Sequence, residues 1–275
     1  MISMPLLKRN LLSSLKIMAI LYAVMTMYTI VIIYMFDPAL SEMLEGFQNA
    51  MPEMMRAFGM SGMASTLLEF IRLYLYGFIM LIFPLVFSII QVHRLLTHYI
   101  DCGSMATLLA TPNSRTKVLR TQWVSIVITL AILLTLVTVT GLCSCMIMFP
   151  NELDIKRYLL LNLMLFLFHL CLAAMIFLAG CLFNDSKTFY LFGAGLPILF
   201  YLFQMLSDMG EKLEWLRNLT LFTLFPSETI VTAEYTSFSE FAGTGILGNS
   251  LVLIGLCLIF YAIGYTYFKR KDLPL

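Results

Sequence analysis

Charged residues are missing from six long stretches of this chain, and their absence excludes an ordinary soluble protein. The stretches contain no Asp, Glu, Lys or Arg and together hold more than half of the 275 residues: Ile17 to Phe36, Leu73 to Val92, Thr121 to Asn151, Tyr158 to Asn184, Thr188 to Ser207 and Phe241 to Phe268. In a helix, about 20 apolar residues span the roughly 30 Å hydrocarbon core of a bilayer. Only 12% of the chain is charged, whereas a soluble domain has about a quarter of its residues charged.

These stretches also lack the alternation of apolar and polar side chains that membrane β-barrels show. In lipid, every backbone N–H and C=O group must find its hydrogen-bond partner within the protein, so apolar stretches of this length form helices. The sequence therefore predicts an all-α polytopic membrane protein with a single transmembrane domain over residues 1–275. Its six expected spans are about 17–36, 70–92, 121–149, 158–183, 188–207 and 245–268.

The chain has few of the residue patterns that carry enzyme chemistry. It contains no G-x-x-x-x-G-K-[ST] sequence, and therefore no nucleotide-binding P-loop of its own, and no H-E-x-x-H zinc motif. His93 and His98 are poorly spaced for joint metal binding, and Cys143 and Cys145 would point to different faces of one helix. We expect no catalytic residue, no metal and no cofactor on this chain, and no nucleic acid among its partners.

Two features fit an intramembrane enzyme and need a second explanation. His169 lies near the middle of the fourth span, where an ionisable side chain is a candidate functional group; the alternative is a neutral histidine hydrogen-bonded to a neighbouring helix. Gly59-Met60-Ser61-Gly62 matches the G-x-S-G of rhomboid-type proteases. Ser61 falls in a loop, however, whereas such a nucleophile must be shielded beside its base. A glycine-rich turn explains these four residues better.

Acidic residues are absent from all six stretches, which argues against a proton-coupled secondary transporter. The polar side chains within them are neutral and include Ser88, Gln91, Gln122, Ser125, Thr129, Asn162, Gln204, Asn249 and Ser250. Most of these can satisfy contacts between helices. They would tolerate a lipophilic or amphipathic cargo better than a bare ion.

Basic residues are unevenly distributed among the segments that connect the spans. If the N-terminus is cytoplasmic, the cytoplasmic segments hold three acids (Asp101, Asp185 and Asp272) and eleven of the 17 basic residues: Lys8, Arg9, Lys16, Arg94, Arg115, Lys117, Arg120, Lys187, Lys269, Arg270 and Lys271. By the positive-inside rule, this distribution predicts a multi-pass plasma-membrane protein with both termini in the cytoplasm. Lys156 and Arg157 are a minor exception.

The N-terminal segment has an amphipathic pattern. Met4, Leu7, Leu11 and Leu15 fall on one helical face of residues 4–16. This pattern predicts an interfacial amphipathic helix on the inner leaflet, and the alternative is that the segment is simply the flank of the first span.

Two later segments carry signals of irregular helix. Residues 208–240 are too apolar for a solvated loop and too interrupted for a span, which predicts a re-entrant or interfacial hairpin broken at Pro226. In the fifth span, Gly193, Gly195 and Pro197 predict a kink or a locally unwound turn, either as a moving part or as a static packing kink.

The loop between the second and third spans has helix-breaking residues at both ends. Gly103 would end the second helix, and Ser104 could cap a short new one. The other residues that define the loop are Met105, Leu108 and Leu109 on the apolar face of that short helix, Pro112 as its stop, and Ser114 as the cap of a following helix that carries Arg115. A two-turn helix held in this way could seat in a groove on a cytosolic partner, and an ordinary structured loop is the alternative.

This loop and the surrounding plan resemble the ABC-2 type permease family, the membrane subunits of many ABC exporters. That family typically has an acidic residue and Gly, a short Leu-rich segment and Pro-x-Ser-Arg between spans two and three. The matching residues are Asp101, Gly103, Leu108-Leu109 and Pro112-Asn113-Ser114-Arg115. The family often has two adjacent acids before the Gly, whereas this chain has Asp101 alone.

The resemblance implies a transport permease without catalysis of its own. A separate cytosolic ABC ATPase, which holds ATP and Mg, would bind the coupling helix from Ser104 to Thr111. ATP-driven closure would move this permease against a second copy or a homologue, with an export path between them lined mostly by spans one, two and five. The residues leave open a stand-alone secondary transporter or channel, or a membrane subunit that senses or anchors without transporting.

Overall fold

The computed structural model describes residues 2–36, 46, 50–57, 64, 66–105, 108, 114–209, 211–233 and 243–271. Throughout these residues the regular structure is helical. Within them, six helices are long and apolar enough to cross a membrane: Met4–Tyr34, Ile79–Asp101, Arg115–Met148, Ile155–Leu182, Ser186–Met209 and Ile246–Arg270. The expectation of an all-α chain with six spans is therefore confirmed.

Four spans are continuous α-helices and two contain a π-helical turn. The continuous ones are α1 (Met4–Tyr34), α8 (Arg115–Met148), α9 (Ile155–Leu182) and α14 (Ile246–Arg270). The second span consists of α5 (Ile79–Val92), the π turn η2 (His93–Thr97) and α6 (His98–Asp101), and the fifth of α10 (Ser186–Phe189), the π turn η3 (Tyr190–Ala194) and α11 (Gly195–Met209). The shorter helices are α3 (Pro52–Ala57), α4 (Leu67–Ile71), η1 (Arg72–Tyr76), η4 (Glu211–Leu219), η5 (Leu221–Leu224) and α12 (Ser227–Thr232).

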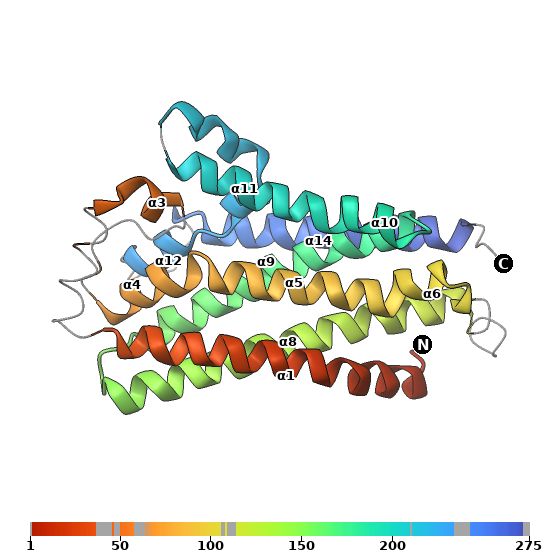
Figure 1. Ribbon diagram of the computed structural model, residues 1–275, viewed down its shortest axis with the longest axis horizontal. Coiled ribbons are helices and arrows are strands. Elements are labelled where there is room, and N and C mark those ends of the chain that lie inside the picture. Colours follow the sequence, from red (N-terminus) through yellow and green to blue (C-terminus); the bar gives the residue numbers. More distant parts are fainter. Residues whose placement is uncertain are drawn as a thin grey trace.

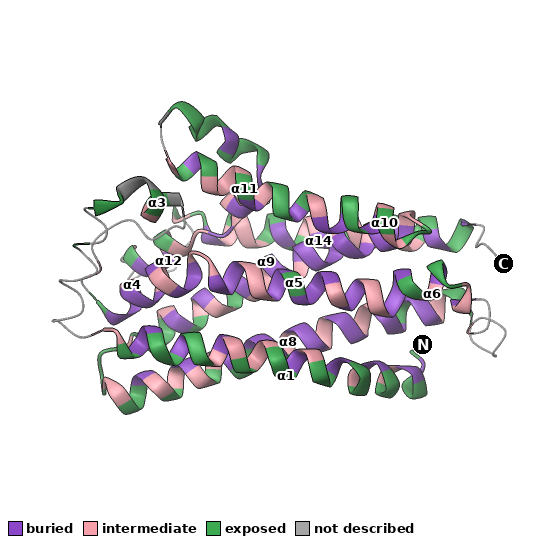
Figure 2. Cartoon of the chain, in the orientation of Figure 1, coloured by how far each residue is buried: buried purple, intermediate pink, exposed green. Residues whose placement is uncertain are grey.

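The spans lie side by side in one elongated bundle, with both termini at the same end (Figure 1). α9 is the central helix, because it packs against α14, α5 and α8 and most of its apolar stretch is buried. α1 and α11 instead expose much of their surface (Figure 2), and the exposed side chains include Ile20 and Leu202. In a membrane, such apolar faces meet lipid or another membrane helix.

The first span includes the N-terminal segment. Met4–Tyr34 is one continuous helix, so the expectation of a separate amphipathic helix over residues 4–16 is corrected, and the segment is the flank of the first span. This part of α1 turns polar residues toward the bundle and apolar residues outward. Met4 is 71% exposed and Leu15 46%, whereas Asn10 and Ser14 are each 1% exposed.

A buried polar cluster explains this orientation. The Asn10 amide donates to Gln122 Oε1 at 2.6 Å and to Ser125 Oγ at 2.9 Å, and the Ser14 hydroxyl donates to Gln91 Oε1 at 2.9 Å. Within lipid, polar side chains find their partners on neighbouring helices while apolar ones can face outward. The cluster therefore ties α1 to both α5 and α8.

His169 repairs a gap in the hydrogen bonding of α5. Pro84 lies inside this helix and has no N–H to offer the Met80 carbonyl four residues earlier. His169 of α9 is fully buried, and its Nε2 lies 2.9 Å from that carbonyl oxygen. Since a carbonyl only accepts, Nε2 carries the proton. Of the two explanations for His169, the structure supports the histidine bonded to a neighbouring helix.

Removing this donor has a predictable effect. His169→Leu should lower the stability of the purified protein by about 1–3 kcal/mol, because it leaves a buried carbonyl without a partner. Thermal unfolding in detergent measures the loss. In a Pro84→Ala background, the alanine supplies the missing N–H and the cost of His169→Leu should shrink. An equal cost in both backgrounds would show that the histidine acts in some other way.

Short helices cover the bundle end that lies away from the termini. Phe222 and Phe225 pack on Phe168 of α9, with ring centroids 4.9 and 5.8 Å apart. Pro226 separates η5 from α12, so the helix breaks at Pro226 as expected, and the re-entrant or interfacial hairpin over residues 208–240 stays a prediction.

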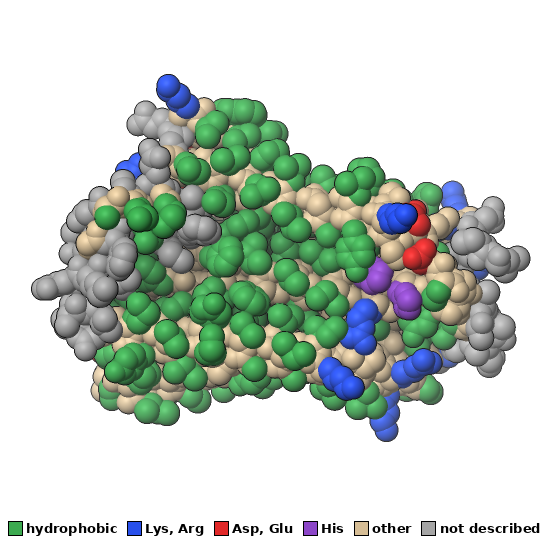
Figure 3. Space-filling model, in the orientation of Figure 1, with side chains coloured by type: hydrophobic (Ala, Val, Ile, Leu, Met, Phe, Trp, Pro, Cys, Tyr) green, Lys and Arg blue, Asp and Glu red, His purple; other side chains and the backbone are tan. Residues whose placement is uncertain are grey.

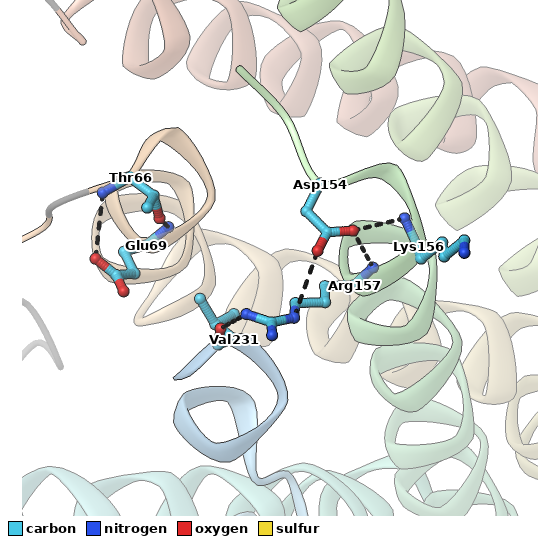
Figure 4. A network of polar contacts seen from close by, with 6 residues as sticks. All are labelled: Thr66, Glu69, Asp154, Lys156, Arg157 and Val231. Carbon is cyan, nitrogen blue, oxygen red and sulfur yellow. Dashed lines mark hydrogen bonds and ion pairs between the residues drawn. The ribbon is translucent and has the colours of Figure 1, made fainter. Parts of the chain in front are cut away.

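Arg157 anchors this group of helices to the bundle. Its guanidinium donates to the Val231 carbonyl of α12 at 2.8 Å. It also pairs at 3.4 Å with Asp154, which caps the start of α9 (Figure 4). Of the two basic residues that depart from the positive-inside distribution, Arg157 therefore has a structural role.

Candidate functional site at the basic end

Lys and Arg side chains gather at the bundle end that holds both termini (Figure 3). We call this the basic end; it comprises the start of α1, the end of α6, the starts of α8 and α10, and the end of α14. Lys8, Arg9 and Lys16 are exposed here. All predicted coupling residues that the structure describes lie at this end.

The boundaries of the predicted coupling segment are as expected. α6 ends at Asp101, and Gly103 adopts φ +68°, a left-handed conformation that favours glycine at a helix end. Ser114 caps α8, with its side chain accepting from the Lys117 N–H at 3.3 Å. The predicted helix break at Gly103 and the predicted cap at Ser114 are therefore confirmed.

Part of the segment between these boundaries lies outside the described residues, including Leu109 and Pro112. Of the others, Met105 is 2% exposed, and Leu108 packs, partly buried, against the core. Ser104 donates to the Tyr99 carbonyl at 3.4 Å. The prediction that residues 104–111 form a helix for a partner stays a prediction.

Asp101 connects the end of the second span to the start of the fifth. The Ser186 hydroxyl, in the first turn of α10, donates to Asp101 Oδ2, and His93 Nε2 lies 3.0 Å from Ser186 Oγ. Because the serine proton goes to the carboxylate, the histidine donates to the serine oxygen. In a catalytic triad the histidine stands between serine and acid and accepts the serine proton. This arrangement therefore holds two helices together and does not activate a nucleophile.

Arg115 and Lys271 form a second connection at the basic end. Arg115 donates to the backbone carbonyl of Lys271 at 2.9 Å. The ammonium of Lys271 donates to the carbonyls of Cys181, Leu182 and Phe183 at 2.8, 2.9 and 3.1 Å. These carbonyls end α9, where a helix leaves carbonyl groups without N–H partners and favours a positive charge. The start of span three and the ends of spans four and six thus meet at Lys271.

The fifth span is irregular where glycine and proline were expected to disturb it. Tyr190–Ala194 forms the π turn η3 directly before Gly195 and Pro197. A side chain at Gly193 would place its Cβ 2.9 Å from the Phe189 ring and 3.2 Å from Ala179 Cβ of α9, so a larger residue here would force the Phe189 ring and the α9 contact to shift. π turns are rare and recur at functional sites in helices.

Sequence reasoning missed Ser186 and the contacts of Lys271. Ser186 was part of a short turn, and Lys271 was one of three basic residues at the end of the last span. Their partners lie 85 to 156 positions away in the chain, so no local pattern marks them. Within the described part of the chain, no three His, Cys, Asp or Glu side chains are grouped as a metal site requires.

The amino-acid sequence matches a known protein family. A family model described as ABC-2 family transporter protein matches residues 4–273, nearly the whole chain. The chain belongs to this ABC-2 transporter family. No curated protein and no solved structure matches it.

This membership confirms the resemblance carried by the loop residues. The chain is the permease, that is the multi-pass membrane subunit, of an ABC transporter. Permeases of this family are generally not enzymes and work with an ABC ATPase.

Proposed function

We propose that this permease exports a lipophilic or amphipathic substrate, with energy from ATP and Mg bound on a separate cytosolic ATPase. It works in the plasma membrane with a second permease copy or a homologue, and its basic end faces the cytoplasm. The observation that carries the proposal is the family match over residues 4–273. The clustering of Lys and Arg at the end that holds both termini supports the orientation (Figure 3).

The ATPase would dock on residues 104–111, which we call the coupling segment. The coupling residues are Asp101, Gly103, Ser104, Met105, Leu108, Leu109, Pro112, Ser114 and Arg115. The segment starts where α6 ends and stops where α8 begins. A movement of the ATPase would therefore act on the second span, through α6, and on α8 at the same time.

The Ser186 contact would carry the same movement into the fifth span. Asp101 lies three positions before the first residue of the coupling segment, and Ser186 begins α10. Four residues later the span enters the π turn η3, followed by Gly195 and Pro197. We assign η3, Gly195 and Pro197 the role of a flexible joint between α10, which Ser186 would move, and α11.

The substrate path would lie between two permeases, against spans one, two and five. α1 and α11 supply exposed apolar faces, which suit a cargo with a lipid-like part. The helices η4, η5 and α12 would form the re-entrant hairpin at the outer end.

Reconstitution tests the proposal against its alternatives. The permease and the ATPase encoded beside it would be placed in liposomes, and ATP-dependent movement of a fluorescent phospholipid or hydrophobic dye would be followed. We expect flux only with both subunits and ATP. Flux driven by an ion gradient through the permease alone would favour a stand-alone secondary transporter, and an ATPase complex without flux would favour a sensing or anchoring subunit.

Ser186→Ala tests the proposed transmission. The change removes the hydrogen bond to the Asp101 carboxylate, which is the stronger charge-assisted kind, worth about 1.5–3 kcal/mol. We expect the number of substrate molecules moved per ATP hydrolysed to fall by about fivefold or more, while the ATPase still binds.

Thr266→Ala is the matched control. Its hydroxyl also lies at the basic end but bonds only to carbonyls of its own helix, at 2.9 and 3.0 Å. If Ser186→Ala and Thr266→Ala kept the same transport per ATP, the contact would have no part in coupling.

A further inference from the structure

A charged pocket of about 370 Å³ opens at the end of the bundle opposite the basic end. Its walls come from α3, η1, α11, η4, η5 and α12. Three arginines (Arg56, Arg72 and Arg217) and two acids (Asp208 and Glu228) line it. In a chain with only 12% charged residues, this concentration of charge in one pocket needs a reason.

Arg72 is the best-placed of these charges to meet a ligand. It is half-buried, and its Nε is buried without a hydrogen-bond partner among the described residues. Gln204 Oε1, on the same pocket wall, is likewise buried and unpartnered. Buried polar atoms in native proteins are almost always satisfied by protein, water or ligand, so both atoms point to a bound polar group.

The carboxylates of the pocket form no direct salt bridge with its arginines among the described residues. Within the described residues the ion pair is Arg157 with Asp154, and none of the three pocket arginines takes part in one. Asp208 accepts two hydrogen bonds from the Gln204 amide at 3.1 Å. Glu228 and Glu69 act on Arg72, and Arg217 acts on Asp208, through charge at longer range and without direct contact. Positive and negative groups therefore stand in one pocket without forming direct ion pairs in the part of the chain that the structure describes.

Aromatic side chains form the apolar part of the walls. Tyr76, Tyr201, Phe222 and Phe225 line the pocket, and the Tyr201 and Phe222 rings are in edge contact at 5.4 Å. The α12 wall is held in place by the bond from Arg157 to Val231 (Figure 4). The pocket thus places charged groups of both signs beside an apolar surface.

We propose that this pocket binds the zwitterionic head group of an amphipathic molecule on the outer side of the membrane. Its anionic phosphate or carboxylate would bind Arg72, with Arg56 and Arg217 nearby, since guanidinium groups match these oxygens in bidentate geometry. Its cationic amine would lie against Asp208 and Glu228, and its apolar part against the aromatic wall. The assignment rests on the proposed function and narrows the cargo to a zwitterionic amphipath.

Binding to the purified permease without its ATPase tests the assignment. The probe is dihexanoylphosphatidylcholine below its micelle concentration, followed by the fluorescence of Trp215, which belongs to the η4 wall, in a Trp123→Phe background. We expect saturable binding, with inorganic phosphate and choline each binding at least tenfold more weakly. Arg72→Gln should weaken lipid binding about tenfold, and Arg72→Lys less, because lysine keeps the charge and loses the fork.

Two further variants keep the test decisive. Lys156→Gln removes an exposed charge at the same end outside the pocket and should leave binding unchanged. Arg217→Gln alters an exposed residue on η4 and should weaken binding even if Arg72 variants fail to fold. Asp208→Asn should weaken binding of the choline lipid and spare dihexanoylphosphatidylglycerol, which has no amine.

Three outcomes would overturn the assignment: no lipid binding, binding unaffected by both arginine variants, or inorganic phosphate binding as tightly as the lipid. Lipid binding without ATP-driven transport would instead contradict the proposed function and leave the pocket assigned. ATP-driven transport without lipid binding at the pocket would support the proposed function and contradict the assignment of the pocket.

Discussion

Replacing Leu108 and Leu109 together by aspartate is expected to abolish ATP-driven transport. If these leucines fill a groove on the ATPase, each contributes up to about 1.5–3 kcal/mol of apolar burial, and Leu108 contributes less because it is already partly buried. Losing both would weaken the complex at least about a hundredfold, since each 1.4 kcal/mol is a factor of ten. Burying two carboxylates in an apolar groove adds a further cost. Co-purification with the ATPase and ATP-dependent flux in liposomes measure the effect.

A matched control separates docking from damage to the permease. Leu213 and Leu219 lie on η4 at the opposite end and are 37% and 51% exposed. Replacing them by aspartate adds the same two charges at the end that, in the proposed orientation, faces away from the cytosolic subunit. We expect this variant to retain the ATPase. If the Leu108 and Leu109 variant also co-purified with the ATPase and transported normally, the coupling segment would not be the docking site.

Lys271→Met is expected to cause the largest loss of stability among single changes at the basic end. The ammonium satisfies three carbonyls at the end of α9, and the residue is only 9% exposed. Hydrogen bonds to charged groups are worth about 1.5–3 kcal/mol each but do not add fully. We therefore expect a loss of about 2–4 kcal/mol, measured by thermal unfolding of the purified permease.

Lys269→Met provides the comparison for this change. Lys269 belongs to the same basic run at the end of α14 but is exposed, so its replacement should cost less than about 0.5 kcal/mol. Similar losses for the two variants would mean that the run acts through its total charge, and the specific role of Lys271 would be disproved.

Local patterns were sufficient for the number of spans and for the boundaries of the coupling segment, although the second span lies at Ile79–Asp101 and was expected at about 70–92. The six charge-free stretches set the number of spans, because only helices satisfy the backbone in lipid. Gly103 and Ser114 were readable because a left-handed helix end favours glycine and a helix start favours serine, wherever they occur. The family itself could be recognised from about a dozen residues around them.

The orientation of the first helix could not be read in the same way. The pattern of Met4, Leu7, Leu11 and Leu15 suggested an apolar face for the membrane surface. The structure buries Asn10 and Ser14 because they hydrogen-bond to Gln91, Gln122 and Ser125. These partners lie 77 to 115 positions away in the chain, so no local pattern shows which face turns inward. When the solvent is lipid, burying apolar side chains in the protein brings little gain, so the polar groups decide which face turns inward.

Long-range polar contacts account for the rest. Pro84 predicts a carbonyl without its usual donor, but nothing near it in sequence names His169 as the replacement. Likewise Ser186 and Lys271 gain their roles from helix ends that meet only in the folded bundle. A single ionisable residue in a span or at its edge therefore indicates a buried polar contact without identifying it.

Cysteine labelling from each side of the membrane tests the central claim, that the ATPase acts at the basic end, most directly. Cys102 is exposed next to the coupling segment, and its hydrogen bond to Ser104 lowers the pKa of its thiol, which favours the reactive thiolate. With a membrane-impermeant maleimide and Cys102→Ser as the blank, we expect labelling in inside-out vesicles, none in intact cells, and protection when the ATPase is bound. Labelling of Cys102 from outside intact cells would contradict the account.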